Sequence, residues 1–286
     1  MNKIIIIADS TCDLPLTMRE ERGIESIPLH VTFKGIEKDY KDGVDIDVEG
    51  VYQNVEKTGN TPITGAVNAS EFIDLFRKHI DNGDSVIYIS IGSGLSCTYN
   101  NAYNASFEFP EGRVEVIDGE NLSVGTGLLI LKACDYRDEG LGIEEIAERI
   151  RKHVPLLSTK FCIDRLDYLA KGGRCSGMTK SLAHMLHIHP IAKMINNKLT
   201  VYKKPRGLYK KAIDEQVKEL VKDLKNIDTT RVMIVNSGHM DGEDIYCKEE
   251  VKKYINEENI IEAKAGCVIT SHCGPKTIGI IYLLKK

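Results

Sequence analysis

The stretch that decides the fold is residues 86–102, VIYISIGSGLSCTYNNA. Residues 86–91 form a short apolar run rich in β-branched side chains, which predicts a buried strand. The small residues of Gly92–Ser96 predict a loop, and Thr98–Ala105 predicts a helix with Ser96 as its N-cap. A strand, a glycine-containing turn and a helix N-terminus present backbone N–H groups to an anion. This loop is therefore a candidate site for a phosphate or a carboxylate.

Three chemistries are compatible with such a loop in principle. A dinucleotide-binding fingerprint requires G-x-G-x-x-G, but Cys97 occupies the last glycine position. A nucleophile elbow requires G-x-S-x-G, but Thr98 stands where the sharp turn requires glycine. The third alternative is a passive cradle, in which Ser93, Ser96 and backbone amides hold an oxyanion or a carboxylate. An ordinary loop that leads into a capped helix explains the same residues.

Length and composition indicate a globular protein of about two domains. The chain has 286 residues, of which 42% are hydrophobic and 28% are charged. The formal net charge of −4 offers no basic surface for nucleic acid. No apolar run approaches transmembrane length, and the apolar run in MNKIIIIADS is too short for a signal peptide. We therefore expect a cytoplasmic protein without stable membrane insertion.

The cysteines and histidines do not predict a metal site. The eight cysteines contain no C-x-x-C pair and match no zinc spacing, so we expect reduced thiols. His184, His187 and His189 lie close together, but no nearby carboxylate completes a set of ligands. We expect no metal and no cofactor.

Strand and helix signals alternate through the first half of the chain, with predicted strands at residues 3–8, 24–33, 86–91 and 114–117. Residues 59–68 are expected to form a loop. The alternation predicts a doubly wound parallel α/β domain over residues 1–157. In such sheets ligands bind beyond the carboxyl ends of the strands, where the Gly92–Ser96 loop lies.

The pattern changes near Pro155, and residues 158–286 predict a second α/β domain with a mixed sheet. Its predicted strands include a hairpin around Asn196-Asn197 and the segments 156–163, 231–235, 260–263, 268–271 and 277–284. A helix from Ser176 to Leu186 carries three apolar residues that are candidates for a tunnel wall, although core packing explains them equally well: Leu182, Met185 and Leu186. We expect a ligand to lie in the cleft between the two domains.

Six motifs, taken in order, resemble the DegV family over almost the whole chain. They are IIADSTCDLP, Thr64 followed by small residues, IGSGLSCTYNNA, LDYLAKGGR, KKPRG and SHCGPKTIG. The resemblance implies a two-domain α/β protein that binds one long-chain fatty acid between its domains. Members of the family include the fatty-acid-binding subunits of bacterial fatty acid kinase. It therefore implies a lipid-binding protein without catalytic activity, which presents the carboxylate to a separate ATP-dependent kinase subunit for acyl-phosphate formation.

The resemblance also implies site residues. Ser93 matches a serine that contacts the carboxylate, Thr64 matches a threonine of another loop, and His272 matches the histidine of a late motif. With the neighbouring loop residues, the predicted carboxylate-binding set is Thr64, Ser93, Gly94, Ser96 and His272. Arg174 and Arg206 match basic positions near the carboxylate mouth, where the kinase partner would dock.

The chain departs from the family pattern close to these positions. Small or sulfur-containing residues replace hydroxyl, amide or other side chains at Gly65, Ala66, Val67, Cys97, Gly119 and Cys273. These changes bear on the hydrogen bonds around the carboxylate and on the acyl preference, but they leave Thr64, Ser93 and His272 intact.

A serine hydrolase is the alternative function. Ser96, Asp118 and His272 follow the order of the catalytic residues in α/β-hydrolases. Against it, the elbow glycine is missing, and Asp118 follows Ser96 too closely for the strands that usually separate them. A DNA-binding regulator has no support from the charge or from any motif.

Overall fold

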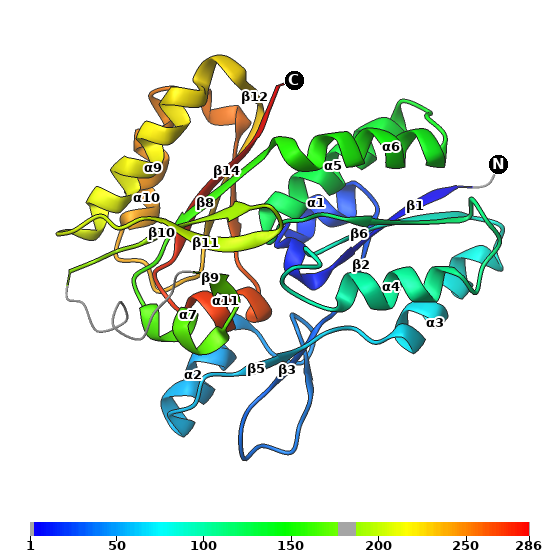
Figure 1. Cartoon of the computed structure of the whole chain (residues 1–286), viewed down its shortest axis with the longest axis horizontal. Helices are drawn as coiled ribbons and strands as arrows, with labels where there is room; N and C mark the ends of the chain where they lie inside the picture. Colours follow the sequence, from blue (N-terminus) through cyan, green and yellow to red (C-terminus); the bar gives the residue numbers. More distant parts are fainter. Residues whose placement is uncertain (1–2, 177–186, 286) are drawn as a thin grey trace.

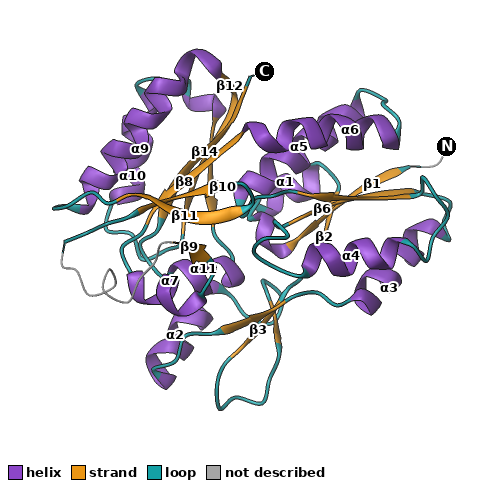
Figure 2. Cartoon of the chain, in the orientation of Figure 1, coloured by secondary structure: helices purple, strands orange, loops and turns teal. Residues whose placement is uncertain are grey.

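The computed structural model describes residues 3–176 and 187–285, which form two main sheets and one small sheet (Figure 1). Figure 2 shows that helices flank both main sheets, and that the small sheet of β3, β4 and β5 lies apart from them. The architecture is an α/β fold with one parallel and one mixed sheet, which confirms the predicted fold class.

The first main sheet is parallel, with strand order β2-β1-β6-β7. Alternate residues of its strands point to opposite faces, so Ile6 packs against α5 and α6, while Ile7 packs against α3 on the other face. This is the doubly wound arrangement that the sequence predicts. The elements are β1 (Ile4–Asp9), α1 (Leu16–Glu21), β2 (Ile24–Ile27), α3 (Ala69–Ile80), β6 (Ser85–Ser90), α4 (Thr98–Ser106), β7 (Val114–Asp118), α5 (Val124–Asp138) and α6 (Ile143–His153).

The second main sheet is mixed, with strand order β13-β12-β14-β8-β10-β11-β9. One face is covered by α9 and α10 through a core that includes Ile213 and Ile280, and the other face packs against α5 through Met233. The two sheets therefore share a core, and the division at residue 157 stays a prediction. The elements are β8 (Leu157–Cys162), α7 (Leu166–Gly172), β9 (Cys175–Ser176), β10 (Ile191–Ile195), β11 (Lys198–Lys203), α9 (Tyr209–Asp223), β12 (Ile227–Asn236), α10 (Glu243–Lys252), β13 (Ile260–Lys264), α11 (Cys267–Cys273) and β14 (Ile278–Leu284).

Two predictions for the first half of the chain were wrong. The single strand expected over residues 24–33 is two strands in different sheets, because Pro28 lies between them and has no N–H to donate to a ladder. The second piece, β3 (His30–Thr32), pairs with β4 (Tyr40–Lys41) and with β5 (Ile63–Gly65). The loop expected over residues 59–68 therefore contains a strand, which carries Thr64. Between β4 and β5 lies α2 (Val48–Thr58), at whose N-terminus the Asp47 side chain accepts a hydrogen bond from the N–H of Gly50.

Two further predictions about helices need correction. Residues 268–271 belong to α11 and not to a strand, since the Asp42 carboxylate accepts hydrogen bonds from the backbone N–H groups of Cys267 and Val268 at the start of this helix. The N-cap position of α4 is Cys97 and not Ser96. Ser96 instead accepts a hydrogen bond at its Oγ from the N–H of Thr98, at 3.3 Å.

The predicted helix over residues 176–186 falls almost entirely outside the described residues. Only Ser176, the last residue of β9, is described. The assignment of Leu182, Met185 and Leu186 to a tunnel wall therefore stays a prediction.

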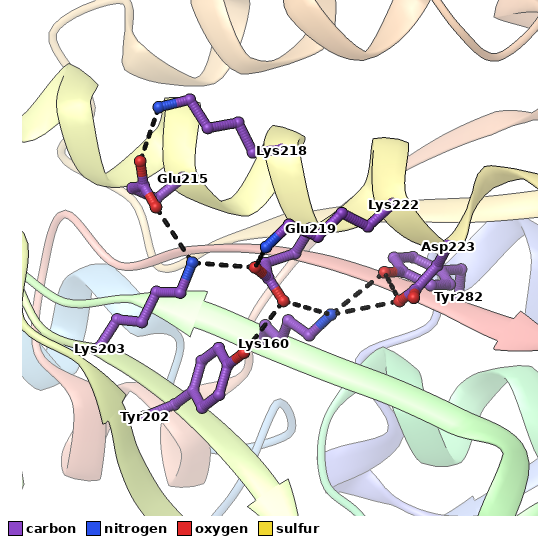
Figure 3. Close-up of polar contacts among 9 residues, drawn as sticks. All are labelled: Lys160, Tyr202, Lys203, Glu215, Lys218, Glu219, Lys222, Asp223 and Tyr282. Atoms are coloured by element: carbon purple, nitrogen blue, oxygen red, sulfur yellow. Dashed lines mark hydrogen bonds and ion pairs between the residues drawn. The ribbon is translucent and has the colours of Figure 1, made fainter.

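A buried charged network fixes α9 to the mixed sheet (Figure 3). Lys160 of β8 is 3% exposed, and its Nζ donates to Oη of Tyr282 at 3.2 Å and to Asp223 at 3.5 Å. Lys203 of β11 donates to Glu219 of α9 at 2.9 Å. Burial lowers the pKa of Lys160, and the nearby carboxylates of Asp223 and Glu219 partly oppose this shift. The network lies on the α9 face of the sheet.

Candidate ligand-binding site

A cavity of about 410 Å³ opens where the carboxyl end of β6 meets the mixed sheet. Its volume lies in the usual range for small-molecule sites. Most of its wall is apolar and comes from both halves of the chain, including Ile91, Leu122, Phe161, Leu169, Leu199 and Ile269. The polar wall residues include Thr64, Ser93, Ser96 and His272. The cavity therefore suits a ligand with a long apolar part and a small polar head.

Thr64 and His272 form a direct pair at this cavity, although 208 residues separate them in sequence. Oγ1 of Thr64 on β5 lies 2.8 Å from Nε2 of His272. His272 lies near the end of α11, and not in a loop between strands as predicted. Burial, together with the positive charge of Arg174, lowers the pKa of His272 to about 4, against a raising contribution from the backbone of Gly172. The imidazole is therefore neutral at pH 7.

The structure explains why the LDYLAKGGR motif contains two adjacent glycines. A β-carbon at Gly172 would lie 2.5 Å from Nδ1 of His272, so any larger residue would displace the ring. Gly173 ends α7 with a φ of 67°, which side chains rarely adopt. The motif thus allows α7 to approach the histidine closely.

Ser93 lies in the loop after β6, between two groups that hold it in place. Its N–H donates to Oδ1 of Asp118 at 3.0 Å, and its Oγ accepts from Nδ2 of Asn197 at 2.8 Å. Gly94 and Ser96 line the same cavity, and Ser96 Oγ lies 2.9 Å from Oγ1 of Thr98. The structure thus brings all five predicted carboxylate-binding residues to one cavity, while their contact with a ligand stays a prediction.

Asn197 is a polar neighbour of this site that the sequence reasoning did not assign to it. It lies in the turn of the β10–β11 hairpin, which the Asn196-Asn197 pair predicts correctly. The sequence carries no sign that this turn docks on the Ser93 loop, because the contact joins two different sheets. The departures Gly65, Ala66, Cys97 and Cys273 also line the cavity.

The two arginines predicted to dock a partner lie in different places. Arg174 lines the cavity, is exposed, and donates from Nη1 to the carbonyl oxygen of Gly172 at 2.9 Å. Arg206 is also exposed but lies outside the cavity wall, where its backbone bridges to Ile188. The cavity wall thus includes Arg174 and not Arg206.

The geometry gives the serine hydrolase alternative no support. Ser96 Oγ is paired with Thr98, Asp118 binds the Ser93 N–H and Asn197, and His272 is paired with Thr64. Among these described contacts, no hydrogen bond joins any two of Ser96, Asp118 and His272. A base that activates a serine must lie within hydrogen-bond reach of it.

Within residues 3–176 and 187–285, no three His, Cys, Asp or Glu side chains gather in a way that suits a metal ion. His189 instead pairs with Asp164 at 3.1 Å, and His184 lies outside the described residues. No helix in the same part of the chain is long and apolar enough to cross a membrane.

The fold and the cavity define an α/β protein with two main sheets and a mostly apolar cavity where they meet. A family model described as an uncharacterised protein of the DegV family matches residues 3–285, so this chain belongs to the DegV family. A DegV domain-containing protein of Clostridium acetobutylicum is 33% identical to this chain over 285 residues, and the alignment covers 100% of both proteins.

Solved structures agree with this assignment. One, described as fatty acid binding of a DegV family protein from Thermus thermophilus, has a TM-score of 0.90 and 28% identity over 99% of both chains. Another, described as a stearic acid-binding protein from Eubacterium ventriosum, has a TM-score of 0.86 and 26% identity over 100% of this chain and 99% of that chain. Both share the complete fold.

Proposed function

We propose that this protein binds one long-chain fatty acid, with its carboxylate at Thr64, Ser93 and His272 and its tail in the apolar part of the cavity. The observation that carries the proposal is that these three groups, from distant parts of the sequence, line one cavity whose remaining wall is mostly apolar. The fatty-acid-binding descriptions of the structural relatives support it.

The energetics suit such a ligand. Each buried methylene contributes about 0.8 kcal/mol, so a long chain contributes on the order of 10 kcal/mol before the costs of association. The hydroxyls of Thr64 and Ser93 can donate to the carboxylate, and charge-assisted bonds of this kind are strong. The neutral His272 has one N–H, which can hold the Thr64 oxygen or the ligand itself. Tail burial then supplies affinity, and the polar groups supply orientation.

A second, smaller space supports one direction for the tail. Four residues of the cavity wall, Leu122, Phe161, Ile269 and Cys273, also line a void of about 20 Å³ that extends toward Ile281 in the core. This void is lined by residues of the mixed sheet and of α11, and Arg174 is not part of its wall. The proposal places the end of the tail on this side and the carboxylate at the rim.

The protein is proposed to act without catalysis of its own and to present the carboxylate to a partner kinase for acyl-phosphate formation. Exposed Arg174 at the cavity supports an accessible carboxylate, and Arg206 is proposed as a second docking contact. ATP consumption by the purified chain with added fatty acid, in the absence of any other protein, would contradict the non-catalytic part of the proposal.

The binding itself is tested with Ser93→Ala in a calorimetric titration with palmitate. Loss of one hydrogen bond to a charged group costs about 1.5–3 kcal/mol, so the affinity should fall about tenfold to a hundredfold. The ligand-free stability should hardly change, since Asn197 keeps its bonds to Asp118 and Gly94. Ser106→Ala is the matched control, because Ser106 Oγ donates to the Tyr103 carbonyl on the same helix and bonds no other group among the described residues. Parent-like affinity in Ser93→Ala would refute the assignment.

A further inference from the structure

The tip of the β10–β11 hairpin, which belongs to the mixed sheet, lies on the loop after β6, which belongs to the parallel sheet. Ile195 pairs with Lys198, so Asn196 and Asn197 alone form the turn, with φ angles of 49° and 59°. Positive φ at both central residues is the pattern of a type I′ turn, in which asparagine and glycine are preferred. The turn thus projects a polar tip toward the site.

The glycines of the loop make room for this tip. A β-carbon at Gly94 would lie 1.9 Å from the backbone oxygen of Asn197, and one at Gly92 would lie 2.5 Å from its Oδ1. The first clash requires movement of the hairpin backbone, and the second requires at least a shift of the Asn197 side chain. The Gly92-Ser93-Gly94 sequence is therefore shaped to receive Asn197, in addition to any role in holding an anion.

The orientation of the Asn197 amide is fixed by its neighbours. The N–H of Gly94 can only donate, and it donates to Oδ1 of Asn197 at 3.2 Å. The carboxylate of Asp118 can only accept, and its Oδ2 lies 3.1 Å from Nδ2. Both contacts assign the same positions to the amide oxygen and nitrogen, so Nδ2 is the atom that lies 2.8 Å from Ser93 Oγ.

This contact determines what the Ser93 hydroxyl can do. A hydroxyl has one donor and two acceptor positions, and Asn197 fills one of the acceptor positions with an N–H. The Ser93 proton therefore points away from the amide and remains available to a ligand in the cavity that Ser93 lines. Without Asn197 the hydroxyl would be free to rotate.

We propose that Asn197 is a positioning residue that aims the Ser93 hydroxyl at the ligand's carboxylate and ties the hairpin of the mixed sheet to the site. This inference rests on the proposed fatty acid binding. It assigns to Asn197 no contact with the ligand, so its effect must pass through Ser93.

The test is a double-mutant cycle with palmitate as the probe. Asn197→Gly removes the amide and keeps a residue suited to positive φ, and Asn196→Gly is the matched control in the same turn. We expect about a tenfold loss of palmitate affinity for Asn197→Gly, and parent-like affinity for Asn196→Gly. In a Ser93→Ala background, Asn197→Gly should cause no further loss, because the hydroxyl that it positions is gone.

A second variant reverses the polarity of the contact. Asn197→Asp keeps an oxygen for the Gly94 N–H, but it removes the donor to Ser93 and turns a second carboxylate toward Asp118, so it should lose affinity at least as strongly as Asn197→Gly. Equal affinities of Asn197→Gly and Asn196→Gly, or the same loss with and without Ser93, would overturn the inference alone. Failure of the parent chain to bind palmitate would overturn the proposed function and, with it, this inference.

Discussion

Thr64→Val tests the pair at the centre of the site, because valine keeps the shape of threonine and removes its hydroxyl. Oγ1 of Thr64 lies 2.8 Å from Nε2 of His272, and the ring is largely buried. A buried polar group that loses its partner costs about 1–3 kcal/mol. In a chain of this size each kcal/mol lowers Tm by roughly 2–4 °C. Calorimetric unfolding without ligand should therefore detect a lower Tm.

The same substitution removes a proposed donor to the carboxylate, so a palmitate titration should show a loss of affinity of about tenfold to a hundredfold. Thr32→Val is the matched control, because Thr32 lies on the neighbouring strand β3 and its hydroxyl donates to the Ile63 carbonyl at 3.3 Å and bonds no side chain within the part of the chain that the structure describes. An unchanged Tm together with unchanged affinity in Thr64→Val would refute the reasoning. Equal effects of the two substitutions would do the same.

Three other predictions concern stability and the partner. Lys160→Met breaks the buried network and should lower the free energy of unfolding in urea by about 1–3 kcal/mol, whereas an unchanged midpoint would show that the network is dispensable. Burial acts to raise the pKa of Glu219, but hydrogen bonds from two lysines outweigh it and lower the pKa to about 2. The stabilisation that comes from this lowered pKa is complete above pH 4.5, the usual pKa of a glutamate, and is lost as the pH falls from 4.5 toward 2. Glu219→Gln should therefore flatten the fall in Tm over that pH range. A parent-like slope would contradict this. Arg174→Ala and Arg206→Ala should reduce acyl-phosphate formation with the proposed kinase partner more than palmitate affinity, and equal losses of the two would contradict a role of these arginines in docking.

The central strands β1 and β6 of the parallel sheet could be predicted from the sequence because they are largely continuous apolar runs, as in residues 86–91. The helical structure of residues 268–271 could not be predicted, because the β-branched residues of this segment favour a strand by local preference. The decisive contacts are tertiary. Asp42, distant in sequence, holds the first N–H groups of α11, and the helix packs against α7.

The candidate site shows the same limit. Spacing alone does not bring Thr64 and His272 together, and only the family resemblance suggested that they share a site. Their hydrogen bond depends on β5, a strand that the sequence reasoning took for a loop. Asn197 was recognised as a turn residue, but the docking of its turn on Gly94 depends on how two sheets pack together.

Native mass spectrometry of the purified protein tests the central claim most directly. A fatty acid held by a buried tail dissociates slowly enough to remain with the protein through purification, so the account predicts a noncovalent adduct. Released from the protein, the adduct should fragment as a long-chain fatty acid, and its amount should be reduced in Ser93→Ala and in Thr64→Val. A ligand-free protein that also fails to take up added palmitate, or an adduct of a different chemical class, would contradict the account.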